Sequence, residues 1–186
     1  MKKIISLTAL LLCVSMLFAG CGNKQDPSIP DGFQLISSEE ADYNLYVPTE
    51  WIPGINNLST SAYFSRGADA TSISVTAFGA DLAGQTVEKW WDGYKKDFEA
   101  EFDNFQVVSE EDASLGGVDG KKYTFTATKG VETDAEGKET ATQYNFICVA
   151  VVKDTYVYFL LYTSTPKYYE EHLSTLGDVI SHFSFK

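Results

Sequence analysis

Three acidic residues at alternate positions have the spacing that most resembles a metal-binding sequence. Glu132, Asp134 and Glu136 precede a glycine, as the oxygen ligands do in the first half of a calcium loop. Calcium takes about six or more oxygen ligands, and Gln143 stands where such a loop carries its bidentate Glu. The sequence therefore favours a solvated acidic hairpin turn. Calcium binding by this loop and by the acidic residues 110–112 is the alternative.

Other reactive side chains are few. His172 and His182 are ten residues apart on one predicted helix, which separates them by about 15 Å, too far to share an ion. We expect both on the helix surface. Cys148 lies in the apolar run 146–152, which predicts a buried, unreactive thiol. Arg66, the only arginine, could hold an anion but is expected to form a surface salt bridge.

No complete catalytic constellation is found in the sequence. It contains no Gly-x-Ser-x-Gly motif and no glycine-rich phosphate loop. No pair of acidic residues stands out in an apolar setting, as glycoside hydrolysis would require. We therefore predict no catalytic residue, and an envelope hydrolase is only a minor alternative.

The first 21 residues contain the motif with the best-defined chemistry. Lysines at positions 2–3 are followed by the apolar run 4–18, and Ala19 and Gly20 give a small pair before Cys21. A basic start, an apolar stretch and a small pair form a signal that a peptidase removes. The sequence predicts cleavage between Gly20 and Cys21.

This segment resembles the signal of bacterial lipoproteins, although Phe18 stands where Leu is usual. The resemblance implies a diacylglyceryl thioether on the Cys21 sulfur and fatty acyl groups such as palmitate. Two or more acyl chains, at about 0.8 kcal/mol per buried methylene, would anchor the chain stably at the extracytoplasmic face of the cell membrane. A permanent transmembrane helix, which needs about 20 apolar residues, and an ordinary secretory signal are the alternatives.

Charge and cysteine content restrict the possible partners. The 186-residue chain has a net charge of −12, and loss of residues 1–20 removes two lysines and no acidic residue, which gives −14. This charge disfavours nucleic acid and anionic lipid headgroups. Cys148 is the only thiol left after Cys13 is removed and Cys21 is acylated, so we expect no disulfide within the chain.

The sequence divides into three parts. Residues 1–20 form the predicted signal peptide, and residues 21–32 form the lipidated N-terminus and a polar tether that contains Pro27 and Pro30. Ten extended residues of this tether reach at most roughly 35 Å. Residues 33–186 are long enough to bury one core, which predicts a single domain.

Within this domain, strands dominate. Strand-like composition, with alternation of apolar and polar residues in several segments, predicts strands over residues 33–37, 43–47, 61–66, 72–78, 105–114 and 122–128. The last and longest strands, 142–153 and 155–164, carry nearly continuous apolar runs, which are typical of central strands covered on both faces. Pro48 and Pro53 are expected to end strand pairing around Trp51.

Two amphipathic helices complete the predicted elements. Thr86 can cap a helix over residues 87–102, and a second helix over 168–182 follows Pro166. The order of strands, helix, strand meander and helix favours an α+β fold, in which helices pack on an antiparallel sheet.

The first helix carries neighbouring tryptophans. Trp90 and Trp91 point about 100° apart, so both do not fit easily into one core. A partly exposed Trp91 near Tyr94, or near Tyr168 and Tyr169, would form an aromatic docking patch. The sequence favours the other interpretation, in which a wide aromatic stripe simply covers a broad sheet.

Several packing motifs resemble those of PsbP-like proteins. They are residues 46–51, residues 120–123 entering a strand, the strand 156–162, and Pro166 before a last helix that ends at residues 183–185. The resemblance spans nearly all of the predicted domain and implies a PsbP-like fold. Members of that fold include an extrinsic subunit of the oxygen-evolving complex, a Ran-binding protein and bacterial lipoproteins, which dock to other molecules. The resemblance transfers no functional residue.

The sequence thus predicts a membrane-anchored extracytoplasmic lipoprotein with a non-catalytic binding or assembly role. Its partner would be a protein or an envelope component. We expect no cofactor beyond the covalent lipid on Cys21.

Overall fold

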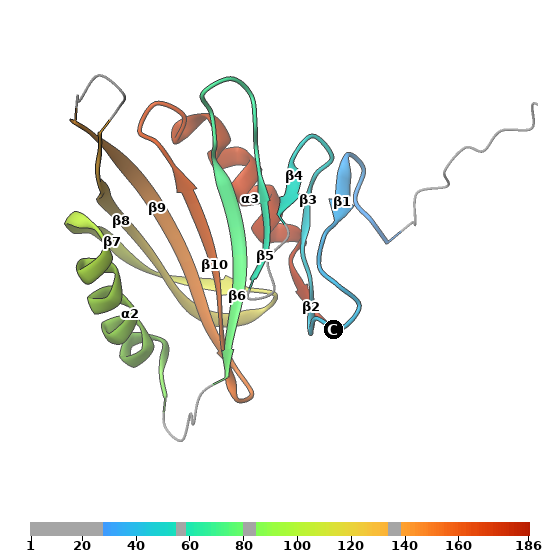
Figure 1. Ribbon diagram of the computed structural model, residues 1–186. Coiled ribbons are helices and arrows are strands. Elements are labelled where there is room, and N and C mark those ends of the chain that lie inside the picture. The colour runs from blue at the N-terminus through green and yellow to red at the C-terminus, as the bar shows by residue number, and fades with distance from the viewer. Residues whose placement is uncertain (1–27, 55–58, 80–84, 134–138) are drawn as a thin grey trace, which may run out of the picture.

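A seven-stranded antiparallel sheet forms the centre of the computed structural model, which describes residues 28–54, 59–79, 85–133 and 139–186. The strand order is β4-β5-β6-β10-β9-β8-β7 (Figure 1). The strands are β4 (Ile52–Gly54), β5 (Ser59–Tyr63), β6 (Ser72–Gly79), β7 (Asp103–Leu115), β8 (Val118–Thr133), β9 (Glu139–Lys153) and β10 (Tyr156–Ser164). The predicted antiparallel α+β fold is confirmed.

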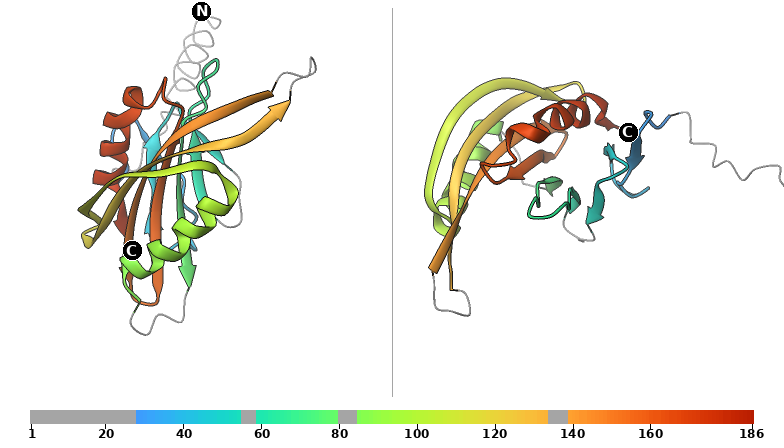
Figure 2. Two further views of the ribbon diagram at one scale, coloured as in Figure 1. Left: turned by 90° about the vertical axis from the view of Figure 1, so that its left-hand side faces the viewer. Right: turned by 90° about the horizontal axis from the view of Figure 1, so that it is seen from above.

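One helix covers each face of this sheet (Figure 2). Helix α2 (Val87–Glu101) begins after Thr86, whose hydroxyl accepts a hydrogen bond from the Lys89 backbone N–H, as predicted. The predicted second helix is divided into a 3₁₀ turn, η1 (Glu170–His172), and helix α3 (Leu173–His182). In the described part of the chain, no helix is long and apolar enough to cross a membrane.

The central strands supply side chains to both helices. On β9, Cys148 and Ala150 belong to the core beneath α2, whereas Val149 and Val151 belong to the core beneath α3. This alternation follows from the two-residue repeat of a strand. It confirms the prediction that the apolar runs form central strands covered on both faces.

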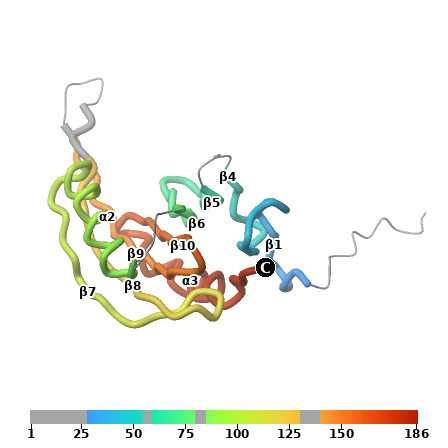
Figure 3. The backbone as a smooth tube through the Cα atoms, turned by 90° about the horizontal axis from the view of Figure 1, so that it is seen from below, coloured from blue at the N-terminus to red at the C-terminus, as the bar shows by residue number. Residues whose placement is uncertain are grey.

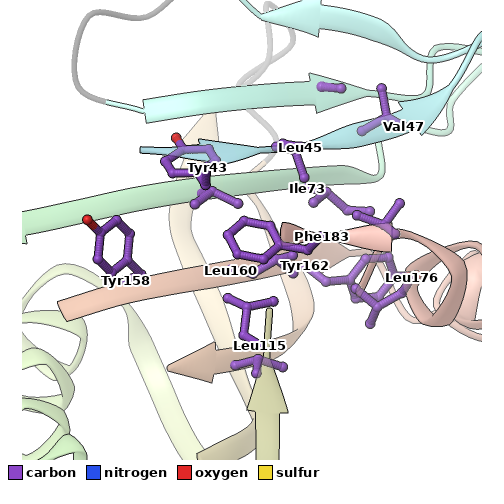
Figure 4. Close-up of a cluster of buried hydrophobic side chains, with 14 of the residues drawn as sticks. Tyr43, Leu45, Val47, Ile73, Leu115, Tyr158, Leu160, Tyr162, Leu176 and Phe183 are labelled. Atoms are coloured by element: carbon purple, nitrogen blue, oxygen red, sulfur yellow. The ribbon is translucent and has the colours of Figure 1, made fainter. Parts of the chain in front are cut away.

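The core on the α3 side joins the beginning and the end of the domain (Figure 4). Strand β1 (Phe33–Leu35) pairs with β3 (Tyr46–Pro48), and β2 (Tyr43–Asn44) pairs with the C-terminal β11 (Ser184–Phe185). Tyr43 on β2, Leu45 between β2 and β3, and Phe183 just before β11 are buried in this core with β10 and α3. Burial of side chains of this size contributes about 1.5–3 kcal/mol each.

Two turns and an edge strand shape the sheet. Pro53 does not end the pairing as predicted but lies in edge strand β4 opposite Ala62, where a proline is tolerated. Gly116 and Gly117 both have positive φ in the two-residue turn from β7 to β8, as such hairpin turns require. Strands β7 and β8 bend strongly (Figure 3), and their register shifts at β-bulges.

Candidate functional site

An aromatic groove lies between α2 and the end of β6. Its volume is about 330 Å³, and its lining consists of Phe78, Gln85, Lys89, Trp90, Gly93, Tyr94 and Asp97. Phe78 is 45% exposed, and Trp90 and Tyr94 are half-buried. The groove therefore presents aromatic rings to solvent.

The buried ring of Phe159 on β10 holds these three aromatic residues in place. Its centroid lies 5.6 Å from that of Phe78, 5.1 Å from that of Trp90 and 5.0 Å from that of Tyr94. Trp90 and Tyr94 also stack on each other at 4.8 Å and 19°. Because Phe159 is only 4% exposed, the groove rests on a packed part of the core.

The predicted docking patch is only partly brought together. Trp91 is 4% exposed and stacks on Tyr123 at 4.0 Å. The prediction of a partly exposed Trp91 in the patch is therefore wrong, and its neighbour Trp90 lies at the surface instead. Tyr168 and Tyr169 precede η1, and Tyr169 packs against the core on the α3 side. The sequence did not single out Phe78, whose place beside Trp90 depends on the docking of α2 near β6.

The groove also has polar ends and a gap. Burial raises the pKa of the Tyr94 hydroxyl, and the carboxylates of Glu101 and Asp97 raise it further, so this phenol stays neutral. Gly93 lies between the aromatic residues, and a β-carbon added there would meet nothing within 4 Å. The groove thus combines ring faces, exposed helix backbone and a carboxylate.

A buried polar network lies on the opposite face of the sheet. Asp69 Oδ2 is 2.7 Å from His172 Nε2, and Asp69 Oδ1 accepts hydrogen bonds from the Thr71 hydroxyl and backbone N–H. The Thr71 hydroxyl in turn lies 2.8 Å from that of Ser164. All four residues are buried. The network therefore joins the loop after β5, the end of β10 and η1.

His172 is accordingly a core residue, and its predicted place on the helix surface is wrong. Its ring packs between those of Trp51 and Phe64, at 5.6 and 4.7 Å. Burial alone would raise the pKa of Asp69, but hydrogen bonds from His172 and Thr71 outweigh it and lower that pKa. Asp69 is therefore ionised at neutral pH.

The network lacks the arrangement that activates a nucleophile. Ser164 bonds to Thr71 and to the Thr165 carbonyl oxygen, whereas nucleophilic catalysis needs the hydroxyl within reach of the imidazole. Arg66 pairs with Asp69 only through the backbone. Its guanidinium is exposed and makes no ion pair with the described residues, so the predicted salt bridge of Arg66 is not found there.

The acidic residues on β7 are paired with lysines. Lys121 Nζ lies 2.8 Å from an Asp112 oxygen and 3.8 Å from a Glu110 oxygen, and Lys122 Nζ lies 2.9 Å from Glu111. These ammonium groups occupy the positions that a cation would take. No group of three or more His, Cys, Asp or Glu residues suited to a metal occurs in the described ranges.

The predicted acidic turn joins β8 and β9, so strands flank it as predicted. Glu132 pairs in register with Thr140 through the backbone. Asp134 and Glu136 lie outside the described residues, and so do Gly20, Cys21 and the signal peptide. Calcium binding and lipidation at these positions stay predictions.

A second hollow of about 410 Å³ lies beside the β9–β10 turn. Its charged and polar groups bond to one another: Lys153 Nζ lies 2.8 Å from Asp154, and the Tyr158 hydroxyl lies 3.2 Å from Asp42. Lys186 Nζ donates to two backbone carbonyl oxygens. The aromatic groove, whose rings face solvent, is the stronger candidate.

Comparison with known proteins bears on the fold. No protein-family model matches the sequence, and no curated protein matches it. The solution structure of cyanobacterial PsbP (CyanoP) from Synechocystis sp. PCC 6803 has a TM-score of 0.55 at 12% identity, over 91% of this chain and 99% of that one. The crystal structure of the Saccharomyces cerevisiae Ran-binding protein Mog1p has a TM-score of 0.54 at 12% identity, over 82% and 95%.

The chain has the Mog1/PsbP-like fold. At 12% identity, this similarity confirms the fold expected from the packing motifs. A shared fold does not identify a function, which depends on the chemistry of this chain's own residues.

Proposed function

We propose that this protein is an extracytoplasmic lipoprotein, anchored through Cys21, that binds a protein or an envelope component through the aromatic groove. The proposal assigns the membrane attachment to the lipid and the recognition to the folded domain. It needs no catalytic step.

The observation that carries the binding role is the exposure of aromatic rings at the groove. Apolar surface left in water costs about 25 cal/mol per Å² relative to burial, and Phe78 keeps 45% of its surface exposed. Trp90 and Tyr94 extend the same surface. Tyrosine and tryptophan are enriched among the residues that dominate binding energy, so a partner that covers this groove would gain affinity from rings already held in place.

The anchor role is supported by the signal sequence. A mature charge of −14, derived from the loss of two lysines, opposes adsorption of the domain to anionic lipids. The tether spans at most roughly 35 Å over ten residues. The groove would therefore meet its partner close to the membrane, with the lipid as the only attachment.

The binding role is tested by photocrosslinking in cells. A photoreactive amino acid replaces Phe78 in one variant and Tyr63, an aromatic residue of similar exposure on β5, in the control. We expect a discrete adduct from position 78 that is absent from position 63 and is lost when Trp90→Ala is added. Equal adducts from both positions, or none from position 78, would contradict the proposed site.

The anchor is tested by fractionation. Cys21→Ala should move the chain from the membrane fraction to the soluble fraction, because no acyl chain can be attached. Cys13→Ala is the matched control, since Cys13 lies inside the predicted signal, and it should leave the chain in the membrane. Membrane retention of the Cys21→Ala chain would contradict lipid anchoring.

A further inference from the structure

The C-terminal end of α2 carries acidic side chains beside the groove. Helices usually place Lys or Arg in the last turn, where the helix dipole is negative, but the last turn of α2 contains no basic residue. Asp97 lines the groove, and Glu101 follows one turn later, close enough to Tyr94 to raise its pKa. This end of the groove therefore favours a positive charge.

The nearby ring faces favour one kind of cation. Trp90 and Tyr94 stack on each other at 4.8 Å and 19° and line the groove together with Asp97; we call this stacked ring pair the shelf. A guanidinium is planar, stacks on aromatic faces and can pair with a carboxylate at the same time. A lysine ammonium fits this shelf less well because it is a compact, strongly hydrated charge.

Gly93 gives a ligand access to the helix. Glycine is a poor residue for a helix interior, and the space around Gly93 would accept a β-carbon without contact, so packing does not require glycine there. A residue without a side chain lets a ligand approach the backbone closely. Gly93 lies one helical turn after Trp90 and one turn before Asp97 on the same side of α2.

Resting on the proposed function, we propose that the groove binds an arginine side chain of a basic polypeptide partner. The guanidinium stacks on the shelf of Trp90 and Tyr94 and pairs with Asp97 and Glu101, while the partner backbone passes over Gly93. The net charge of −12 over the whole chain attracts a basic partner and raises its rate of association.

The other end of the groove gives the ligand a direction. Gln85 and Lys89 line it, and Lys89 is eight residues from Asp97 in sequence, or about 12 Å along the helix axis. The side-chain amide of Gln85 suits a carbonyl oxygen of a peptide backbone. The arginine therefore lies at the Asp97 end, and the chain runs toward Gln85.

The test uses the full chain in detergent micelles and three peptides that differ only at a central residue. That residue is arginine, lysine or citrulline, the last being a neutral analogue with the same shape as arginine. Binding is measured by isothermal titration calorimetry at low and high salt. We expect the arginine peptide to bind about tenfold more tightly than the citrulline peptide, since a cation–π contact and an ion pair add, and more tightly than the lysine peptide.

Matched variants locate the binding. Gly93→Leu fills the gap and should weaken binding of the arginine peptide at least about tenfold, because it blocks approach to the helix, while the melting temperature stays the same or rises. Asp97→Asn should reduce the preference for arginine over citrulline. Asp178→Asn is the control, because it removes one exposed carboxylate from α3, on the other face of the sheet. It should leave the affinity for the arginine and citrulline peptides unchanged.

The outcomes separate this inference from the proposed function. Equal binding of arginine and citrulline peptides, or equal loss in Asp97→Asn and Asp178→Asn, would overturn the arginine site. Preference for a neutral oligosaccharide at the groove would overturn it too. If crosslinking from position 78 persists in any of these cases, the binding role of the groove stands and only the arginine site fails. If that crosslink is also missing, both proposals fail.

Discussion

Replacement of Asp69 by asparagine should reveal how much the buried polar network contributes to stability. The substitution keeps the shape of the side chain and removes its charge. Asparagine can still accept the hydrogen bonds that Thr71 donates to Oδ1, but the 2.7 Å hydrogen bond between the charged carboxylate and His172 is lost. The change therefore tests the contact between Asp69, in the loop after β5, and His172 in η1.

Burial sets the size of the effect. Asp69 and His172 are 4% and 7% exposed, so water cannot solvate the partner that remains. A hydrogen bond to a charged group contributes about 1.5–3 kcal/mol. We expect a loss near the upper end of this range, about 3 kcal/mol, for Asp69→Asn because both residues are buried. For a protein of this size, that loss lowers the melting temperature by roughly 6–12 °C.

The effect depends on pH with a definite sign. The pKa of Asp69 is lower in the folded chain than in the unfolded chain. As the pH falls, Asp69 therefore takes up its proton in the unfolded state before it does so in the folded state. The stabilisation is present above the unfolded pKa of about 3.9 and is lost as the pH falls through the lower folded pKa. The difference between wild type and Asp69→Asn should therefore be largest above about pH 4 and narrow below it.

Urea denaturation followed by circular dichroism between pH 2.5 and 7 measures this difference. Asp92→Asn is the control, because Asp92 is exposed and lies 3.7 Å from Lys95; such a pair contributes about 0–1 kcal/mol. Equal losses in Asp69→Asn and Asp92→Asn at neutral pH would refute the structural role of the network. A difference between Asp69→Asn and wild type that grows as the solution is acidified would refute the direction of the pKa shift.

The contacts of the described residues also predict the behaviour of two tyrosines, of Cys148 and of the acidic residues on β7. Tyr123→Phe should leave the free energy of unfolding unchanged or raise it, because the buried Tyr123 hydroxyl has no hydrogen-bond partner among the described residues. Tyr162→Phe should lower the free energy of unfolding by about 1 kcal/mol, because the Tyr162 hydroxyl donates to the Tyr169 carbonyl oxygen at 2.7 Å. Urea denaturation measures both changes. Cys148 should react with a thiol reagent only after unfolding, since burial raises its pKa; rapid reaction in native buffer would contradict its place in the core. Millimolar calcium should leave the melting temperature unchanged, because the β7 carboxylates already pair with lysines; a shift that grows with calcium concentration would revive the calcium-binding alternative.

Local patterns were sufficient to predict most elements of the fold. The cap at Thr86 predicted the start of α2. Alternation on β6 predicted a strand with Ile73, Val75 and Ala77 on the core face; Ile73 and Val75 lie in the core, whereas Ala77, near the end of the strand, is exposed. The continuous apolar runs of β9 and β10 predicted strands covered on both faces. These features depend on residues close in sequence, where the period of the side chains reports directly on the element.

Features that depend on distant residues could not be predicted. His172 is buried because Asp69, 103 positions earlier, supplies its partner, and no helical pattern contains that information. Trp91 rather than Trp90 entered the core because Tyr123 on β8 offered a ring to stack on. Pro53 suggested a break, yet β4 lies at the sheet edge, where proline costs no ladder hydrogen bond.

The aromatic groove depends both on residues close in sequence and on distant residues. Helical spacing placed Trp90 and Tyr94 on neighbouring parts of α2, so the aromatic character of the site was predictable. The contribution of Phe78 was not, because it depends on how β10 aligns with β6: Phe78 lies opposite Val157 in the register, and its ring stacks on that of Phe159.

The most direct test of the central claim is the intact mass of the protein extracted from membranes, measured beside the Cys21→Ala variant. We predict a species that begins at Cys21 and carries the mass of a diacylglyceryl group, with or without a further acyl chain, and that is absent from the variant. An unmodified chain recovered from the soluble fraction would contradict the lipid anchor, and the domain would then have to act as a freely secreted binding protein.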